Sequence, residues 1–185
     1  DESLHIIATD DSNSLFIPGG GDSFYIEPEI EQLEYDAKGM VTSKKRLGNF
    51  ESLVNKVKTT PFVLIEGSMG IGKSKLGREL FSILLRSDEV EREELFPILM
   101  HCVVFQKNYE FVAEKCTQEY RNKFELGANT KVIIIIDGFD EVDLPDEVRE
   151  GVIRRMFSDI ASEKHLGIVL LSRPLNESQL LGAKI

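Results

Sequence analysis

The sequence predicts an α/β fold in which a central parallel sheet carries helices on both faces. From residue 61 onward, short apolar runs alternate with amphipathic segments of helical periodicity, and this alternation is typical of parallel strands joined by right-handed crossovers. The run at residues 132–136 consists only of Val and Ile, which indicates a strand that is buried on both faces. A chain of 185 residues with 42% apolar and 29% charged side chains is long enough to build one such core.

We divide the chain into a lead segment at residues 1–48 and a core at residues 49–185. Residues 1–21 are rich in Asp, Ser and Gly and are predicted to form a flexible loop. A short strand is expected at residues 24–27, and Glu29–Tyr35 is interpreted as a short acidic helix. The lead segment is therefore expected to be partly flexible.

Within the core, the spacing of apolar residues predicts each element. Strands are predicted at residues 62–65, 98–105, 132–136 and 168–171. A first helix follows Asn49, a suitable N-cap, and a second spans residues 73–85. The apolar positions on the later helices are Leu76, Leu80, Ile83 and Leu84, then Val112, Cys116, Tyr120 and Phe124, then Val148, Val152, Met156 and Ile160. The acidic stretch at residues 87–94 is interpreted as a solvated loop or helix end.

A glycine-rich motif lies between the first core strand and the helix at residues 73–85. Residues 67–74 fit the pattern G-x-x-x-x-G-K-[S/T], in which backbone N–H groups and a helix N-terminus bind phosphate. Lys73 is expected to reach the β- and γ-phosphates of ATP, and the Ser74 hydroxyl is expected to ligate Mg²⁺. The nucleotide-binding residues expected in this segment are Gly67, Ser68, Met69, Gly70, Ile71, Gly72, Lys73, Ser74 and Lys75.

Three acids follow the strand at residues 132–136. Asp137 comes at the carboxyl end of this buried strand, where ligands bind in open α/β sheets, and we expect it to hold Mg²⁺ through a water. Asp140 or Glu141 would orient or deprotonate the water that attacks the γ-phosphate, and the sequence does not choose between them. The structural alternative is that one acid caps a turn and the others are solvated loop carboxylates.

These motifs together resemble the NACHT family of STAND-class P-loop NTPases. The resemblance rests on the motif at residues 67–74, the D-G-F-D-E sequence at residues 137–141 and the S-R-P sequence at residues 172–174. A small residue after the first acid, followed by Asp-Glu, is the NACHT pattern, whereas AAA+ relatives have adjacent Asp-Glu and NB-ARC proteins paired Asp. The resemblance covers about residues 50–174 and implies a three-layer P-loop NTPase fold of the ASCE type. It also implies that Arg173 acts as sensor 1, contacting the γ-phosphate.

The resemblance further implies parts that lie outside this chain. The family core has the strand order 5-1-4-3-2, and residue 185 stands where a fifth strand would begin. The fifth strand and the helical and winged-helix lid subdomains would then be missing, and the first core strand would be an unprotected edge. We therefore interpret the chain as the nucleotide-binding core of a larger protein that has effector and sensor domains elsewhere.

For function, the resemblance implies a cytoplasmic ATP/ADP switch like that of NLR proteins in innate immunity signalling. Exchange of ADP for ATP would open the larger protein and allow it to self-associate, and slow Mg²⁺-dependent hydrolysis would reset it. One alternative is an AAA+ remodelling ATPase, which would need an arginine finger and a pore loop. A less favoured one is a P-loop small-molecule kinase, which would need an acceptor site. GTP is disfavoured because no Asn-Lys-x-Asp tetrad occurs.

Composition argues against several other classes. The net charge of −10 disfavours binding to a nucleic-acid backbone, and the longest apolar run is far below the roughly 20 residues that cross a bilayer. With only two cysteines, Cys102 and Cys116, no disulfide framework is implied, and both are expected to be buried, inert thiols. The three histidines lack metal-ligand spacing, and His101 is interpreted as a packed or hydrogen-bonded core residue.

Overall fold

The computed structural model describes residues 3–9, 29–35, 41–46, 49–102, 113–141 and 144–174. The strands are β1 (Ser3–Thr9), β2 (Glu29–Tyr35), β3 (Val41–Arg46), β4 (Phe62–Glu66), β5 (Leu95–His101), β6 (Lys131–Asp137) and β7 (Leu166–Ser172). The helices are α1 (Phe50–Thr59), α2 (Lys73–Leu85), α3 (Asp88–Glu91), α4 (Ala113–Phe124) and α5 (Asp146–Ser162), with a short 3₁₀ helix, η2, at Phe139–Glu141. These seven strands form one sheet in the order β3-β2-β1-β4-β7-β6-β5.

The centre of the sheet is the parallel arrangement that the sequence predicts. β4 pairs with β7, β7 with β6, and β6 with β5, all in parallel. Numbered along the chain as core strands, this order is 1-4-3-2, as the family resemblance implies. Because these strands point the same way, the loops that follow them meet at one edge of the sheet, where open α/β folds bind ligands.

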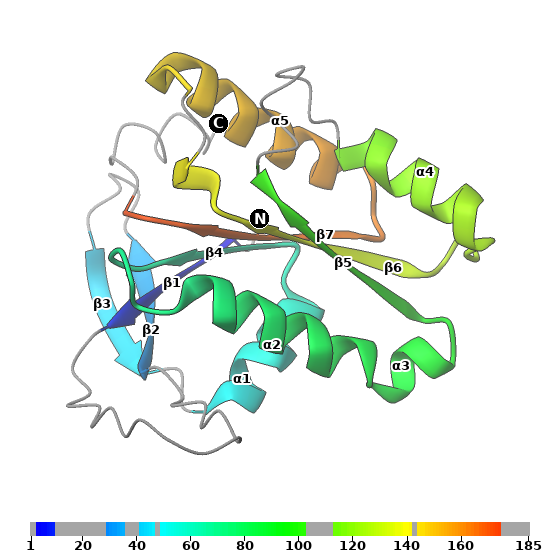
Figure 1. The fold of residues 1–185 in the computed structure, drawn as a ribbon, viewed down its shortest axis with the longest axis horizontal. Coiled ribbons are helices and arrows are strands. Elements are labelled where there is room, and N and C mark those ends of the chain that lie inside the picture. Colours follow the sequence, from blue (N-terminus) through cyan, green and yellow to red (C-terminus); the bar gives the residue numbers. More distant parts are fainter. Residues whose placement is uncertain are drawn as a thin grey trace.

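Helices cover both faces of this parallel sheet, which confirms a three-layer α/β arrangement (Figure 1). Alternate residues of β6 face opposite layers: Ile135 packs with Leu53 of α1 and Leu80 of α2, whereas Ile134 packs with Met156 of α5. Residues 132–136 are fully buried, so the prediction of a strand covered on both faces is confirmed. None of the helices that the structure describes is long and apolar enough to span a membrane.

Most core elements begin where the sequence predicts them. Asn49 caps α1, since its side-chain oxygen accepts a hydrogen bond from the Ser52 backbone N–H at 3.0 Å, and α2 spans residues 73–85. The second strand begins three residues earlier than predicted, at Leu95, and the predicted residues 103–105 lie outside the described part. Ile83 is 40% exposed because it lies beside the buried stripe of α2, so its assignment to the core face is wrong.

Two expectations for the lead segment are wrong. Ser3–Thr9 is a strand rather than part of a loop, and Glu29–Tyr35 is a strand rather than a helix. β2 pairs antiparallel with both β1 and β3, so pairing on both sides satisfies its backbone and outweighs a local helical pattern. The strand expected at residues 24–27 lies outside the described residues.

The expectation that the first core strand is an unprotected edge is also wrong. β1 pairs with β4 in parallel, with Leu4 opposite Val63 and Ile6 opposite Ile65. β4 therefore lies between β1 and β7, and the lead segment supplies the neighbour that was expected to be missing. The side of the sheet next to the glycine-rich loop is closed by residues from the amino-terminal part of the chain.

Gly77 allows α2 to approach the sheet closely. A Cβ atom at this position would lie 2.5 Å from Cδ1 of Leu171, a fully buried residue of β7. Cores of native density have little room to absorb such an overlap. The absence of a side chain at Gly77 therefore sets the distance between α2 and the strand that leads to Arg173.

We expect Gly77→Ala to lower the free energy of unfolding by about 1–2 kcal/mol, because the added methyl overpacks this contact. The matched control is Gly151→Ala in α5, where a Cβ would meet no atom within 4 Å; this change should raise stability by up to about 1 kcal/mol through helix propensity. Denaturant unfolding of both variants measures the difference. Equal effects of the two substitutions would contradict the close packing at Gly77.

Candidate functional site

The glycine-rich loop between β4 and α2 has the backbone conformation that its glycines permit. Gly70 and Gly72 have φ angles of +83° and +97°, in the left-handed region that side chains disfavour. No atom lies within 4 Å of the Cβ position of either glycine. The loop is joined to β7 at its start, where the Gly67 N–H donates to the Ser172 carbonyl at 3.2 Å. The loop is thus an open turn whose positive φ angles require glycine, and it leads directly into α2.

Lys73 folds back over this loop. Its Nζ donates to the carbonyl oxygens of Gly67 at 2.6 Å and Ser68 at 3.0 Å. Burial lowers the pKa of Lys73, whereas the neighbouring carboxylates, Asp140 foremost, act in the opposite direction. The ammonium group is therefore held at the mouth of the loop, within electrostatic reach of the acids that follow β6.

Ser74 and Asp137, the two residues predicted to hold Mg²⁺, lie together at the carboxyl edge of the sheet. The Ser74 hydroxyl donates to Oδ1 of Asp137 at 3.1 Å, although the two residues are 63 positions apart in the chain. Both are half-buried. A hydroxyl and a carboxylate are oxygen ligands of the kind that Mg²⁺ binds, so these residues fit the implied ion. The remaining loop residues are placed differently: Met69 is 78% exposed, and Lys75 lies in the first turn of α2.

Asp140 and Arg173 form a two-point contact beside this pair. Arg173 Nε lies 2.7 Å from Asp140 Oδ2, and the Arg173 backbone N–H donates to Oδ1 at 3.0 Å. Both carboxylate oxygens are therefore engaged, and the Asp140 side chain is only 12% exposed. Arg173 directly follows Ser172, whose carbonyl accepts the Gly67 N–H bond, so the structure brings Arg173 to the start of the glycine-rich loop.

His101 belongs to the site, although the sequence indicated a core residue. Its side chain is 47% exposed, and its Nε2 lies 3.4 Å from Oε2 of Glu141. A Cβ on Gly138, whose φ is +75°, would lie 2.9 Å from the same Nε2. The signal that could have found His101 is the register of the sheet, which pairs it with Asp137 at the carboxyl edge.

The structure describes the side chain of one of the two cysteines, Cys102. Cys102 is fully buried, as expected, and burial raises the pKa of its thiol, which keeps it protonated and unreactive. The side chain of Cys116 lies outside the described part of the chain.

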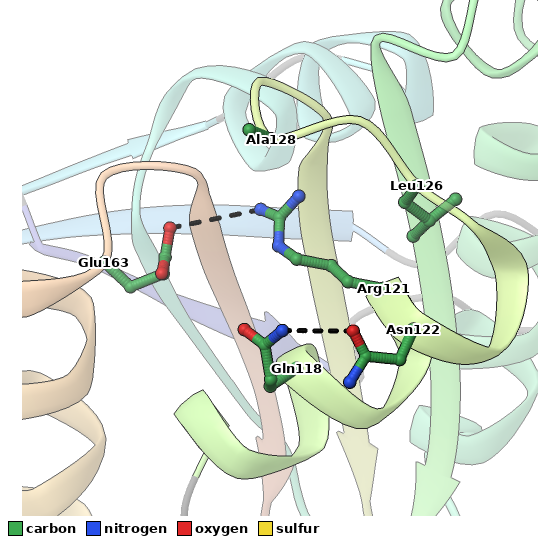
Figure 2. Close-up of a pocket in the computed structure, with 6 residues that line it drawn as sticks. All are labelled: Gln118, Arg121, Asn122, Leu126, Ala128 and Glu163. Atoms are coloured by element: carbon green, nitrogen blue, oxygen red, sulfur yellow. Dashed lines mark hydrogen bonds and ion pairs between the residues drawn. The ribbon is translucent and has the colours of Figure 1, made fainter.

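A separate pocket of about 340 Å³ lies at the opposite edge of the sheet (Figure 2). Its lining comes from α4 and from the connections that precede β6 and β7, which are the amino ends of these parallel strands. Arg121 crosses it, donating to the carbonyl oxygens of Gly127 at 2.7 Å and Thr130 at 2.9 Å and lying 3.9 Å from Glu163. These bonds fix the loop between α4 and β6, so Arg121 has a structural role remote from the glycine-rich loop.

Comparison with known proteins does not identify the chain. No protein-family model, curated protein or solved structure matches it.

Proposed function

We propose that this chain binds ATP and ADP with Mg²⁺ and acts as a slow, nucleotide-dependent switch. The observation that carries the proposal is the meeting of the glycine-rich loop with the acid at the end of β6, through the 3.1 Å contact between Ser74 and Asp137. A glycine-rich turn that opens a helix, with a lysine over it and a carboxylate opposite, has the parts required for binding a nucleoside triphosphate.

Each part has a chemical task. Loop N–H groups and the N-terminus of α2 favour an anion, and the Lys73 ammonium adds a positive charge at the loop mouth. A bound Mg²⁺ would neutralise charge on the β- and γ-phosphates, and Ser74 and Asp137 would hold it. The hydrogen bonds that Lys73 donates to the loop carbonyls would give way to bonds with phosphate oxygens, which are stronger partners for a cation.

The contact between Asp140 and Arg173 favours a switch over a fast ATPase. Carboxylates and phosphates compete for the same guanidinium group, so a γ-phosphate would have to displace Asp140 to engage Arg173. The same exchange would free Asp140. Two alternative pairings of one arginine provide the two-state element that a nucleotide switch needs.

We further propose that the chain is the nucleotide-binding core of a larger, cytoplasmic, NACHT-type protein related to NLR receptors. In such a protein the switch would control opening and self-association, with effector and sensor domains outside these residues. The support is the 1-4-3-2 order of β4, β7, β6 and β5, together with the D-G-F-D-E and S-R-P sequences at the strand ends.

The test is to purify the full-length protein, identify the nucleotide that accompanies it, and measure ATP, ADP and GTP affinity with and without Mg²⁺. We expect adenine nucleotide close to one per chain and turnover well below about one per second, the lower limit for typical enzymes. Turnover at or above that rate would favour the remodelling ATPase, and phosphate transfer to an acceptor other than water would favour the kinase. Failure to bind any nucleotide would refute all three.

A further inference from the structure

The two acids that could act on the attacking water are held in different ways. Both oxygens of Asp140 are engaged with Arg173. The Glu141 side chain is 54% exposed and has its Oε2 3.4 Å from Nε2 of His101. A single, longer contact to an exposed partner is weaker than the two-point contact at Asp140. Glu141 is thus the acid that can be released more easily.

The position of His101 shows on which side of the site its contact holds Glu141. His101 ends β5, and in the sheet order β4-β7-β6-β5 this strand lies on the side of β6 away from β4 and its glycine-rich loop. The 3.4 Å contact of His101 with Glu141 therefore places that carboxylate on the outer, β5 side of the site.

Gly138 makes room for this pair. Its Cβ position is 2.9 Å from Nε2 of His101 and 3.4 Å from Cδ of Glu141, so a Cβ there would overlap the imidazole and touch the Glu141 carboxyl group. The 3₁₀ helix at Phe139–Glu141 starts directly after it, and the Glu141 N–H donates to the Gly138 carbonyl at 2.9 Å. The turn, the histidine and the glutamate therefore form one local unit.

We propose that His101 is a positioning residue that holds the Glu141 carboxylate on the β5 side of the site, away from the glycine-rich loop, and thereby slows hydrolysis. The proposal rests on the proposed function, since it assigns to Glu141 the task of orienting or deprotonating the attacking water. In this proposal His101 slows the switch by holding Glu141 and does not itself contact the nucleotide.

The test is single-turnover ATP hydrolysis by the full-length protein carrying His101→Ala. We expect the rate to rise about two- to fivefold, because a 3.4 Å contact between two exposed side chains is weak and its loss shifts a population only modestly, while the dissociation constant for ATP stays unchanged. His101→Gln keeps a donor that can reach Glu141 and should behave as the wild type. His165→Ala, at the opposite edge of the sheet, is the matched control.

A double-mutant cycle decides whether the effect passes through Glu141. In a Glu141→Gln background, His101→Ala should cause no further rise. A damaged fold would lower the rate in both backgrounds, and a rate that falls or stays constant in His101→Ala would overturn the proposal. Wild-type protein that binds ATP but never hydrolyses it would overturn this inference alone, whereas absence of binding would overturn the proposed function.

Discussion

Replacing Lys73 by alanine in the full-length protein is expected to abolish nucleotide retention and any signalling that depends on it. Its ammonium group is fixed at the loop mouth by the Gly67 and Ser68 carbonyls, so a phosphate would meet a charge already in position. Charge-assisted hydrogen bonds are the strong ones. We expect the affinity for ATP to fall about 100-fold, which corresponds to about 2.7 kcal/mol.

Isothermal titration with ATP and ADP, and chromatography of the released nucleotide, measure this loss. The matched control is Lys56→Ala, which makes the same change at an exposed position of α1 and should leave affinity unchanged. Thermal unfolding without nucleotide should be similar for the two variants, because Lys73 contributes contacts to its own loop rather than to the core. If the Lys73 variant retained ADP at the wild-type level, the proposed function would be refuted.

The core of the fold was predictable because its information is local and repetitive. Residues 132–136 are all Val or Ile, a pattern that predicts a strand covered on both faces, and they are fully buried in β6. The lead segment is different: Glu29–Tyr35 becomes a strand only because β1 and β3 lie on either side of it. Pairing between segments distant in sequence has no signature in the spacing of one segment's own residues.

In the candidate site, too, some positions were predictable from the sequence and others were not. The positions of Ser74 and Asp137 followed from motif spacing and from the rule that parallel strands end at one edge. The partners of Asp140 and Glu141 could not be predicted in this way. Asp140 contacts Arg173, which follows β7, and Glu141 contacts His101 at the end of β5. Since a histidine in an apolar strand is usually a core residue, only the register of β5 against β6 could have indicated that it reaches the site.

The second large effect is expected from Asp137→Asn. The amide oxygen can still accept the Ser74 hydroxyl bond, measured at 3.1 Å for the carboxylate, so the local structure should persist while the negative charge is lost. Because magnesium supplies several kcal/mol of charge stabilisation in phosphoryl transfer, we expect hydrolysis to fall at least about 100-fold. Affinity for ATP in the presence of Mg²⁺ should fall about tenfold or more.

The design separates loss of the metal from loss of the fold. In EDTA the Asn variant should bind ATP as tightly as the wild type, because Lys73 and the loop remain intact, and the two proteins should diverge only as MgCl₂ is added. Asp88→Asn, at an exposed position of α3, should follow the wild-type curve throughout. If the Asn variant kept its full Mg²⁺ response, Asp137 would be a turn residue and the ion would have to be held by other groups. A defect already present in EDTA would instead assign Asp137 a role in shaping the loop through Ser74.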